Sequence, residues 1–123
     1  MNILLVMIGG AIGAGARHLT GRWTLAAFGP GYPWGTLAVN LIGGMLMGVL
    51  AGTLARTSAG EPTRLLLGVG VLGGFTTFSA FSLDMVTMIE RGDAASAIGY
   101  ALVSVVGSVL ALFAGLYAVR AIA

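Results

Sequence analysis

The chain contains no cysteine and no lysine, and its charged residues are six arginines and four acidic residues among 123. Without cysteine it can form no disulfide, no thiolate metal site and no cysteine nucleophile. Charged residues make up 8% of the chain, whereas an average soluble domain carries about 25%. The arginines form no basic run that could follow a phosphate backbone, so we expect no nucleic-acid partner.

Residue types that serve catalysis are equally scarce. His18 is the only histidine, and it stands beside Arg17 at a predicted helix end, where an interfacial polar residue is the ordinary explanation. A hydrolase needs a nucleophile paired with a base, and metal catalysis needs clustered ligands. The sequence supplies neither, and it therefore predicts a protein that is not an enzyme.

Apolar residues are abundant instead, at 58% of the chain, and the mean hydropathy is +1.01. Uncharged segments lie at about residues 2–16, 34–55, 65–83 and 94–119, separated by turn residues at 29–33, 58–62 and 91–93. Each can cross about 30 Å of hydrocarbon, the first if Arg17 and His18 extend toward the headgroups. We predict an all-α membrane protein, with one domain over residues 1–123 and four transmembrane helices at about 2–19, 34–55, 64–90 and 94–121.

The first of these segments has an alternative interpretation as a secretory signal. Ala14-Gly15-Ala16 resembles a signal-peptidase site that follows an apolar run. The basic region that normally precedes such a run is missing, because only Asn2 stands before it. We therefore expect the segment to remain as a transmembrane helix.

The third segment is a poor helix at its centre, which reads Gly73-Gly74-Phe75-Thr76-Thr77-Phe78-Ser79-Ala80-Phe81-Ser82. Its glycines, β-branched threonines and serines weaken helical bonding where no water can replace a lost backbone hydrogen bond. We predict that this helix is broken at mid-membrane. Because exposed backbone groups are tolerated there only beside protein, water or a bound ion, the break indicates an ion or substrate site and hence transport.

The arginines do not decide how the chain is oriented in the membrane. Four spans place Arg56, Arg64 and Arg120 on one side and Arg17, Arg22 and Arg91 on the other, which gives no positive-inside bias. Either the chain inserts in both orientations, which then pair about a two-fold axis in the membrane plane, or signals other than arginine fix one topology. Charge alone leaves both interpretations open.

Polar and small residues recur on the predicted second helix. Asn40 heads a stripe of Gly44, Gly48 and Gly52 at four-residue spacing. The glycines indicate close helix packing. An amide side chain within the membrane needs a polar partner on another helix or contact with an aqueous path, and we expect Asn40 to face an aqueous path.

Hydroxyls and aromatic rings mark the third and fourth helices. On the fourth helix one face carries Ser96, Tyr100, Ser104 and Ser108. A single serine usually bonds the carbonyl four residues back, but hydroxyls in register suggest a polar track. Phe78 and Phe81 also share a face. They are either packing residues or rings whose weakly positive edges attract a small anion.

Together these residues resemble the Fluc (CrcB-type) family of bacterial fluoride channels. The likeness rests on Gly73 to Phe81, on Gly35-Thr36-Leu37-Ala38-Val39-Asn40 and on the Tyr100, Ser104, Ser108 face, and it covers nearly the whole chain. It implies a multi-pass protein of the bacterial inner membrane that exports fluoride passively. It further implies an antiparallel dual-topology homodimer with two pores, each built from both subunits.

The same resemblance implies roles for individual residues. Asn40, Thr77, Phe78, Phe81, Tyr100, Ser104 and Ser108 would line the fluoride pores, and Arg17 would stand near the aqueous vestibule. The backbone carbonyls of Gly73 and Thr76 would hold a structural sodium ion, Na+, on the two-fold axis. The chain departs from the family pattern at Ala80, where threonine is common, and at Asp84, where glutamate is common, and both changes could alter hydration or entry at the pore.

Two other functions compete with a channel. A small multidrug-type proton-coupled exporter shares the size, the four helices and the dual topology. The resemblance to such exporters implies a membrane-embedded carboxylate in the first helix, and residues 1–16 contain none. A non-transporting membrane subunit would explain the glycine stripes and leave the broken helix without a purpose. Ion flux from the purified protein in liposomes separates all three.

Overall fold

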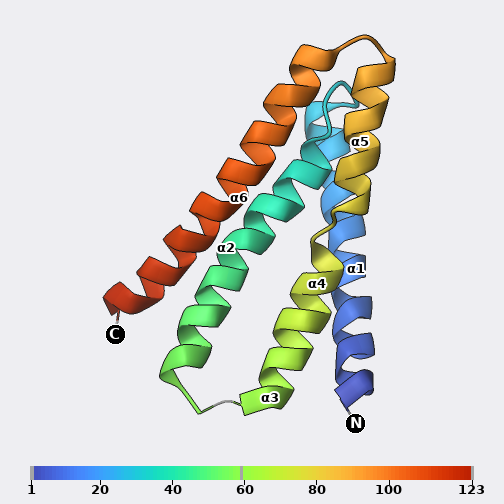
Figure 1. Ribbon diagram of the computed structural model, residues 1–123. Helices are drawn as coiled ribbons and strands as arrows, with labels where there is room; N and C mark the ends of the chain where they lie inside the picture. The colour runs from blue at the N-terminus through green and yellow to red at the C-terminus, as the bar shows by residue number, and fades with distance from the viewer. Residues whose placement is uncertain (1, 59, 123) are drawn as a thin grey trace.

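The computed structural model describes residues 2–58 and 60–122, and in these ranges all regular secondary structure is helical. Four helical segments are long and apolar enough to cross a membrane: α1 (Asn2–Phe28), α2 (Trp34–Arg56), the interrupted segment Gly60–Glu90 and α6 (Ala94–Ile122). Figure 1 shows the chain passing back and forth through them. The predicted all-α fold with four membrane-spanning segments is confirmed, and the chain is a multi-pass membrane protein.

Helix α1 continues to Phe28, beyond the predicted end at about residue 19. The charged residues Arg17 and Arg22 lie inside the helix and do not end it. It ends instead at Gly29, whose φ of +79° favours glycine. At 27 residues the helix is about 40 Å long, so it exceeds the hydrocarbon layer, and the end that carries Arg22 can lie at headgroup level.

The third segment contains four helical pieces and one break. It begins with α3 (Gly60–Thr63) and a π-helix, η1 (Arg64–Leu72), and continues through α4 (Gly73–Phe75) and α5 (Ser79–Glu90). The predicted interruption is present, but the glycines do not cause it: Gly73 is helical, and the chain becomes extended at Thr76, with φ −83° and ψ 161°. No feature of the sequence predicted the π-helix.

Glycines allow the helices to pack closely in two pairs. In α1, a Cβ added at Gly9 or Gly13 would collide with the backbone of η1. In α2, a Cβ added at Gly44 or Gly48 would collide with carbonyl oxygens of α6. The predicted packing role of the glycine stripe on the second helix is therefore confirmed, and α1 packs through glycines in the same way.

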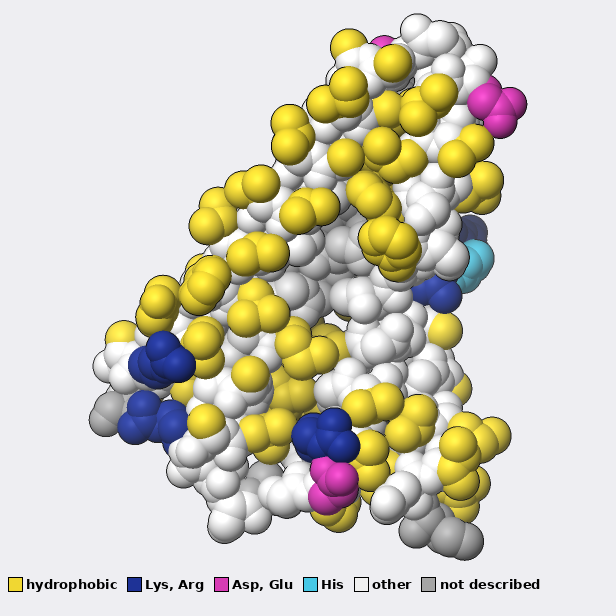
Figure 2. Space-filling view, in the orientation of Figure 1, with side chains coloured by type: hydrophobic (Ala, Val, Ile, Leu, Met, Phe, Trp, Pro, Cys, Tyr) yellow, Lys and Arg dark blue, Asp and Glu magenta, His cyan; other side chains and the backbone are white. Residues whose placement is uncertain are grey.

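The two pairs form two arms that diverge toward one end of the molecule. Helices α2 and α6 form one arm, while α1 and the first half of the third segment form the other (Figure 1). The arms meet near the opposite end, where Leu37, Phe81, Met88, Ala97 and Tyr100 form a small buried core. The visible face is hollowed between the arms (Figure 2).

Candidate functional site

A groove of about 560 Å³ lies between the arms and runs along the broken helix. Its walls come from α2, from the residues around the break and from α6. Of the residues with predicted roles, it brings together Asn40, Gly73, Thr76, Thr77, Phe78, Phe81, Ser104 and Ser108. Tyr100 and Arg17 do not line this groove.

The side chain of Asn40 bridges α2 to the break. Its Nδ2 donates to the carbonyl of Thr77 at 3.0 Å, and its Oδ1 accepts from the Thr77 N–H at 2.9 Å. One amide thus replaces both hydrogen bonds that the Thr77 backbone would make in an uninterrupted helix. We predicted that Asn40 faces a partner or a path; the structure supplies the partner and also places the residue on the groove wall.

The threonine hydroxyls satisfy further polar groups at the break. Thr76 Oγ1 donates to the carbonyl of Leu72 at 2.9 Å, and Thr77 Oγ1 accepts from the N–H of Ala80 at 3.2 Å. Within residues 2–58 and 60–122, no donor reaches the carbonyl oxygen of Gly73 or of Thr76. Both carbonyls belong to residues that border the groove, so the described chain leaves two open acceptors there.

The two phenylalanines differ sharply in exposure. Phe81 belongs to the buried core, whereas 76% of the Phe78 surface is exposed. Their ring centroids are 5.5 Å apart, with planes inclined by 41°. An exposed aromatic ring beside a groove of a membrane protein is free to contact either an ion path or another protein surface.

Ser104 presents the clearest open donor in the groove. The residue is buried, and its Oγ has no hydrogen-bond partner among the described residues. The expected bond to the carbonyl four residues back is not made. Ser108 Oγ lies 3.4 Å from the carbonyl oxygen of Asn40, a long hydrogen bond that leaves it accessible to the groove.

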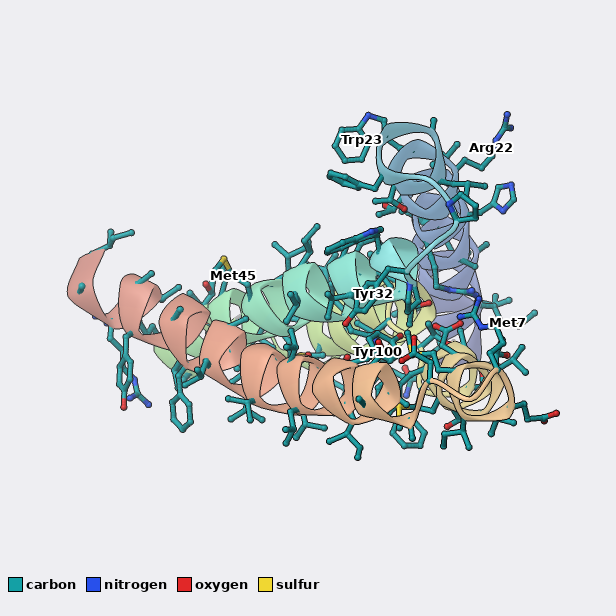
Figure 3. All side chains as sticks on the ribbon, turned by 90° about the horizontal axis from the view of Figure 1, so that it is seen from above. Met7, Arg22, Trp23, Tyr32, Met45 and Tyr100 are labelled. Carbon is teal, nitrogen blue, oxygen red and sulfur yellow. The ribbon has the colours of Figure 1, made fainter. Side chains whose placement is uncertain are left out.

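Tyr100 is fully buried, and its hydroxyl has a partner outside the groove. It donates to Oδ2 of Asp84 at 2.9 Å. Its ring packs against Phe81, with centroids 5.1 Å apart, and edge-on against Tyr32, at 5.6 Å. Figure 3 shows Tyr32 and Tyr100 close together near the start of α2. The predicted hydroxyl face is therefore divided: Ser104 and Ser108 reach the groove, Tyr100 belongs to the core, and Ser96 does not line the groove.

A second cavity, of about 610 Å³, lies on the other side of the break and is more polar. Arg17, His18 and Asp84 line it, and Arg22 stands at the outer edge of α1 (Figure 3). Thr77 borders both cavities. Ala80 and Asp84, the two departures from the family pattern, both face this second cavity rather than the groove. Burial raises the pKa of the Tyr32 phenol in the adjoining loop, so this hydroxyl stays protonated at neutral pH.

Arg17 connects the second cavity to the break. Its Nε donates to the carbonyl of Gly74 at 3.1 Å, replacing a helical bond that the break removes. The other guanidinium nitrogens remain available to the cavity. The sequence missed this contact and the Asp84–Tyr100 bond, although a lone carboxylate within an apolar segment signals that a polar partner must exist.

The chain is similar to known proteins over nearly its whole length. The family described as CrcB-like protein, Camphor Resistance (CrcB), matches residues 4–116. A protein of Mesorhizobium japonicum named fluoride-specific ion channel FluC is 52% identical, with 98% of each chain covered. Proteins of the same name from Sphingopyxis alaskensis and Phenylobacterium zucineum are 56% and 58% identical, covering 98% and 96% of this chain and 97% and 94% of their own.

The Asn40 bridge generates a prediction about stability. In Asn40→Ala, both backbone groups of Thr77 lose their partners. We expect unfolding in detergent to become easier by about 1–3 kcal/mol, the usual cost of leaving such groups unsatisfied. Thermal or denaturant unfolding followed by circular dichroism measures the change.

Thr53→Val provides the control on the same helix. Thr53 Oγ1 also bonds a backbone carbonyl, that of Val49 at 2.8 Å, but this carbonyl belongs to an intact helix and keeps its backbone partner. Equal losses of unfolding free energy in Asn40→Ala and Thr53→Val would show that Asn40 has no special role at the break.

Proposed function

Because the chain belongs to the CrcB-like family, as its motifs predicted, we propose that it is a fluoride-selective ion channel that lets fluoride leave the bacterial cell passively. The observation that carries the proposal is the match of nearly the whole chain to relatives named fluoride-specific ion channels. This assignment makes the protein a transporter and not an enzyme.

The chemistry of the groove suits a small, strongly hydrated anion. Fluoride must exchange its water for other donors, and neutral hydroxyl, amide and N–H groups donate without the strong attraction of a full cation. Ser104 offers a buried hydroxyl with no other described partner. Phe78 and Phe81 add ring edges of weakly positive potential. Several weak sites in series permit conduction, whereas one strong site would trap the ion.

The multidrug-type exporter is not favoured. Helix α1 contains no acidic residue along its length. Asp84, the acidic residue nearest the break, accepts a hydrogen bond from Tyr100 and lies beside the second cavity rather than in the groove. A proton-coupled exporter needs an ionisable group at its substrate site, and the groove has none.

We further propose that the working unit is an antiparallel, dual-topology homodimer with two pores, each built from both chains. The groove of one chain is open to the side, and the exposed ring of Phe78 stands at its edge. A second copy packed against this face would close the groove. The equal division of arginines between the two sides of the membrane is consistent with both orientations being inserted.

The open carbonyls of Gly73 and Thr76 support a structural sodium ion on the dimer axis. Two neutral oxygens from each chain would provide four ligands without a carboxylate, a set that suits a hard monovalent cation better than a divalent one. The threonine hydroxyls bond elsewhere and do not satisfy these oxygens. The cation would hold the two breaks together by compensating carbonyls that hydrocarbon cannot solvate.

Anion efflux tests the channel assignment. Purified protein reconstituted into liposomes should release fluoride rapidly and chloride far more slowly, without a proton gradient. Equal rates for the two anions would overturn selectivity, and flux that requires a proton gradient would support an exporter.

A pair of serine variants links this flux to the groove. Ser104→Ala removes the unpartnered hydroxyl, so it should lower fluoride efflux while leaving stability unchanged or slightly higher. Ser96→Ala is the matched control, because Ser96 lies on the same helix but does not line the groove. If both variants conduct at the parental rate, Ser104 has no part in permeation.

Orientation tests the antiparallel dimer. Two or three lysines added to the loop between α2 and α3 should bias insertion toward one orientation. Fluoride flux should then fall, and coexpression with a variant biased the opposite way should restore it. Undiminished flux from a population shown by protease accessibility to face one way contradicts the antiparallel arrangement.

Cation replacement tests the sodium site. The dimer in detergent should unfold at a higher temperature in sodium chloride than in choline chloride of equal ionic strength, because choline is too large for a carbonyl site. Ligand present at a hundred times its Kd stabilises a folded state by about 2.7 kcal/mol. Identical unfolding temperatures in the two salts would argue against a bound sodium ion.

A further inference from the structure

Two arginines lie opposite one another at the ends of α2 and α6. The two helices run parallel and in register: Gly44 faces Ser108, Gly48 faces Leu112, and Gly52 faces Leu116 and Val119. Each step of four residues along α2 is thus matched by a similar step along α6. One further step of this register places Arg56, in the last turn of α2, opposite Arg120, in the last turn of α6.

No acidic residue neutralises this arginine pair. In the described part of the chain the one ion pair joins Arg64 and Glu61, with Nε and Oε1 2.6 Å apart. The other acidic residues, Asp84, Glu90 and Asp93, lie in or just after α5, toward the opposite ends of the spans. Figure 2 shows basic side chains gathered at the end of the α2–α6 arm, with no acidic group beside them.

Arg120 is held in place by an aromatic column on the outer face of α6. Its Cζ lies 5.6 Å from the centroid of the Tyr117 ring, and this ring stacks on Phe113 with centroids 5.9 Å apart and planes inclined by 19°. Both rings are exposed. A guanidinium over an aromatic ring is attracted by the ring and keeps its planar fork of N–H groups, which can donate to two oxygens at once.

We propose that Arg56 and Arg120 bind the phosphodiester headgroup of an anionic phospholipid. The pair lies where membrane-spanning helices end, and basic residues between such helices are suited to anionic headgroups. The exposed Phe113 and Tyr117 rings lead from Arg120 toward the hydrocarbon, so an acyl chain can lie along them while the phosphate meets the guanidinium groups. The apolar column makes the lipid, and not free phosphate, the ligand.

A simpler role for both arginines is to complement the partial negative charge at the C-terminal ends of their helices. That role requires no lipid and creates no preference among lipids. The two explanations therefore differ in one measurable property, the selectivity for an anionic headgroup.

Native mass spectrometry of the full chain in detergent tests the site, with phosphatidylglycerol and phosphatidylcholine of identical acyl chains as probes. The parent protein should retain phosphatidylglycerol at lower lipid concentration than phosphatidylcholine. Arg56→Gln and Arg120→Gln should each weaken phosphatidylglycerol retention roughly fivefold, as expected for one surface charge near an anionic bilayer. Arg120→Lys, which keeps the charge but loses the planar fork, should weaken it less.

Arg64→Gln is the matched control, because it removes an arginine at the same end of the molecule that already pairs with Glu61. It should leave retention unchanged, and excess inorganic phosphate should not displace the lipid. Equal retention of the two lipids would overturn the proposal, as would an equal loss in Arg64→Gln. Displacement by inorganic phosphate would identify a simple phosphate site and would also overturn it.

Discussion

Hydrocarbon provides no hydrogen-bonding partner for a peptide group, and the structure of this chain depends on how it meets this constraint at one break. Between Thr76 and Phe78 the helix is interrupted, and each backbone group released there needs another partner. Asn40 from α2 satisfies Thr77, and Arg17 from α1 satisfies Gly74. The conformation of the break therefore depends on contacts with two other helices, and not on its local sequence alone.

The same constraint explains which features the sequence could predict. Four spans and the glycine packing of α1, α2 and α6 follow from composition and four-residue spacing, because these properties act along a single helix. The position of the break does not follow in this way. Helix propensity placed it only within the run from Gly73 to Ser82, whose glycines, threonines and serines all weaken a helix. In the structure the two glycines stay helical and Gly74 packs against α1, while Asn40 holds Thr77 out of the helix.

Contacts between helices also limit what the sequence could predict for individual site residues. Periodicity correctly grouped Ser104 and Ser108 beside the groove, but it also included Tyr100, whose size carries its hydroxyl past that face to Asp84. Spacing along a helix gives the direction of a side chain and not its reach. For Arg17 the sequence indicated a polar position near an aqueous entrance, and it could not indicate that one nitrogen of the guanidinium would bond a carbonyl at the break.

The distribution of charge differs between the two cavities on either side of the break. Groove residues are neutral along its whole lining, and the charges of Arg17 and Asp84 stand in the separate cavity beyond Thr77. A fixed charge inside a narrow apolar groove would bind a counter-ion strongly, because the surroundings screen it poorly. The lining of the second cavity is more polar, so it screens a charge better. Thr77 borders both cavities, so the residue that the Asn40 bridge holds at the break also separates the neutral groove from the charged cavity.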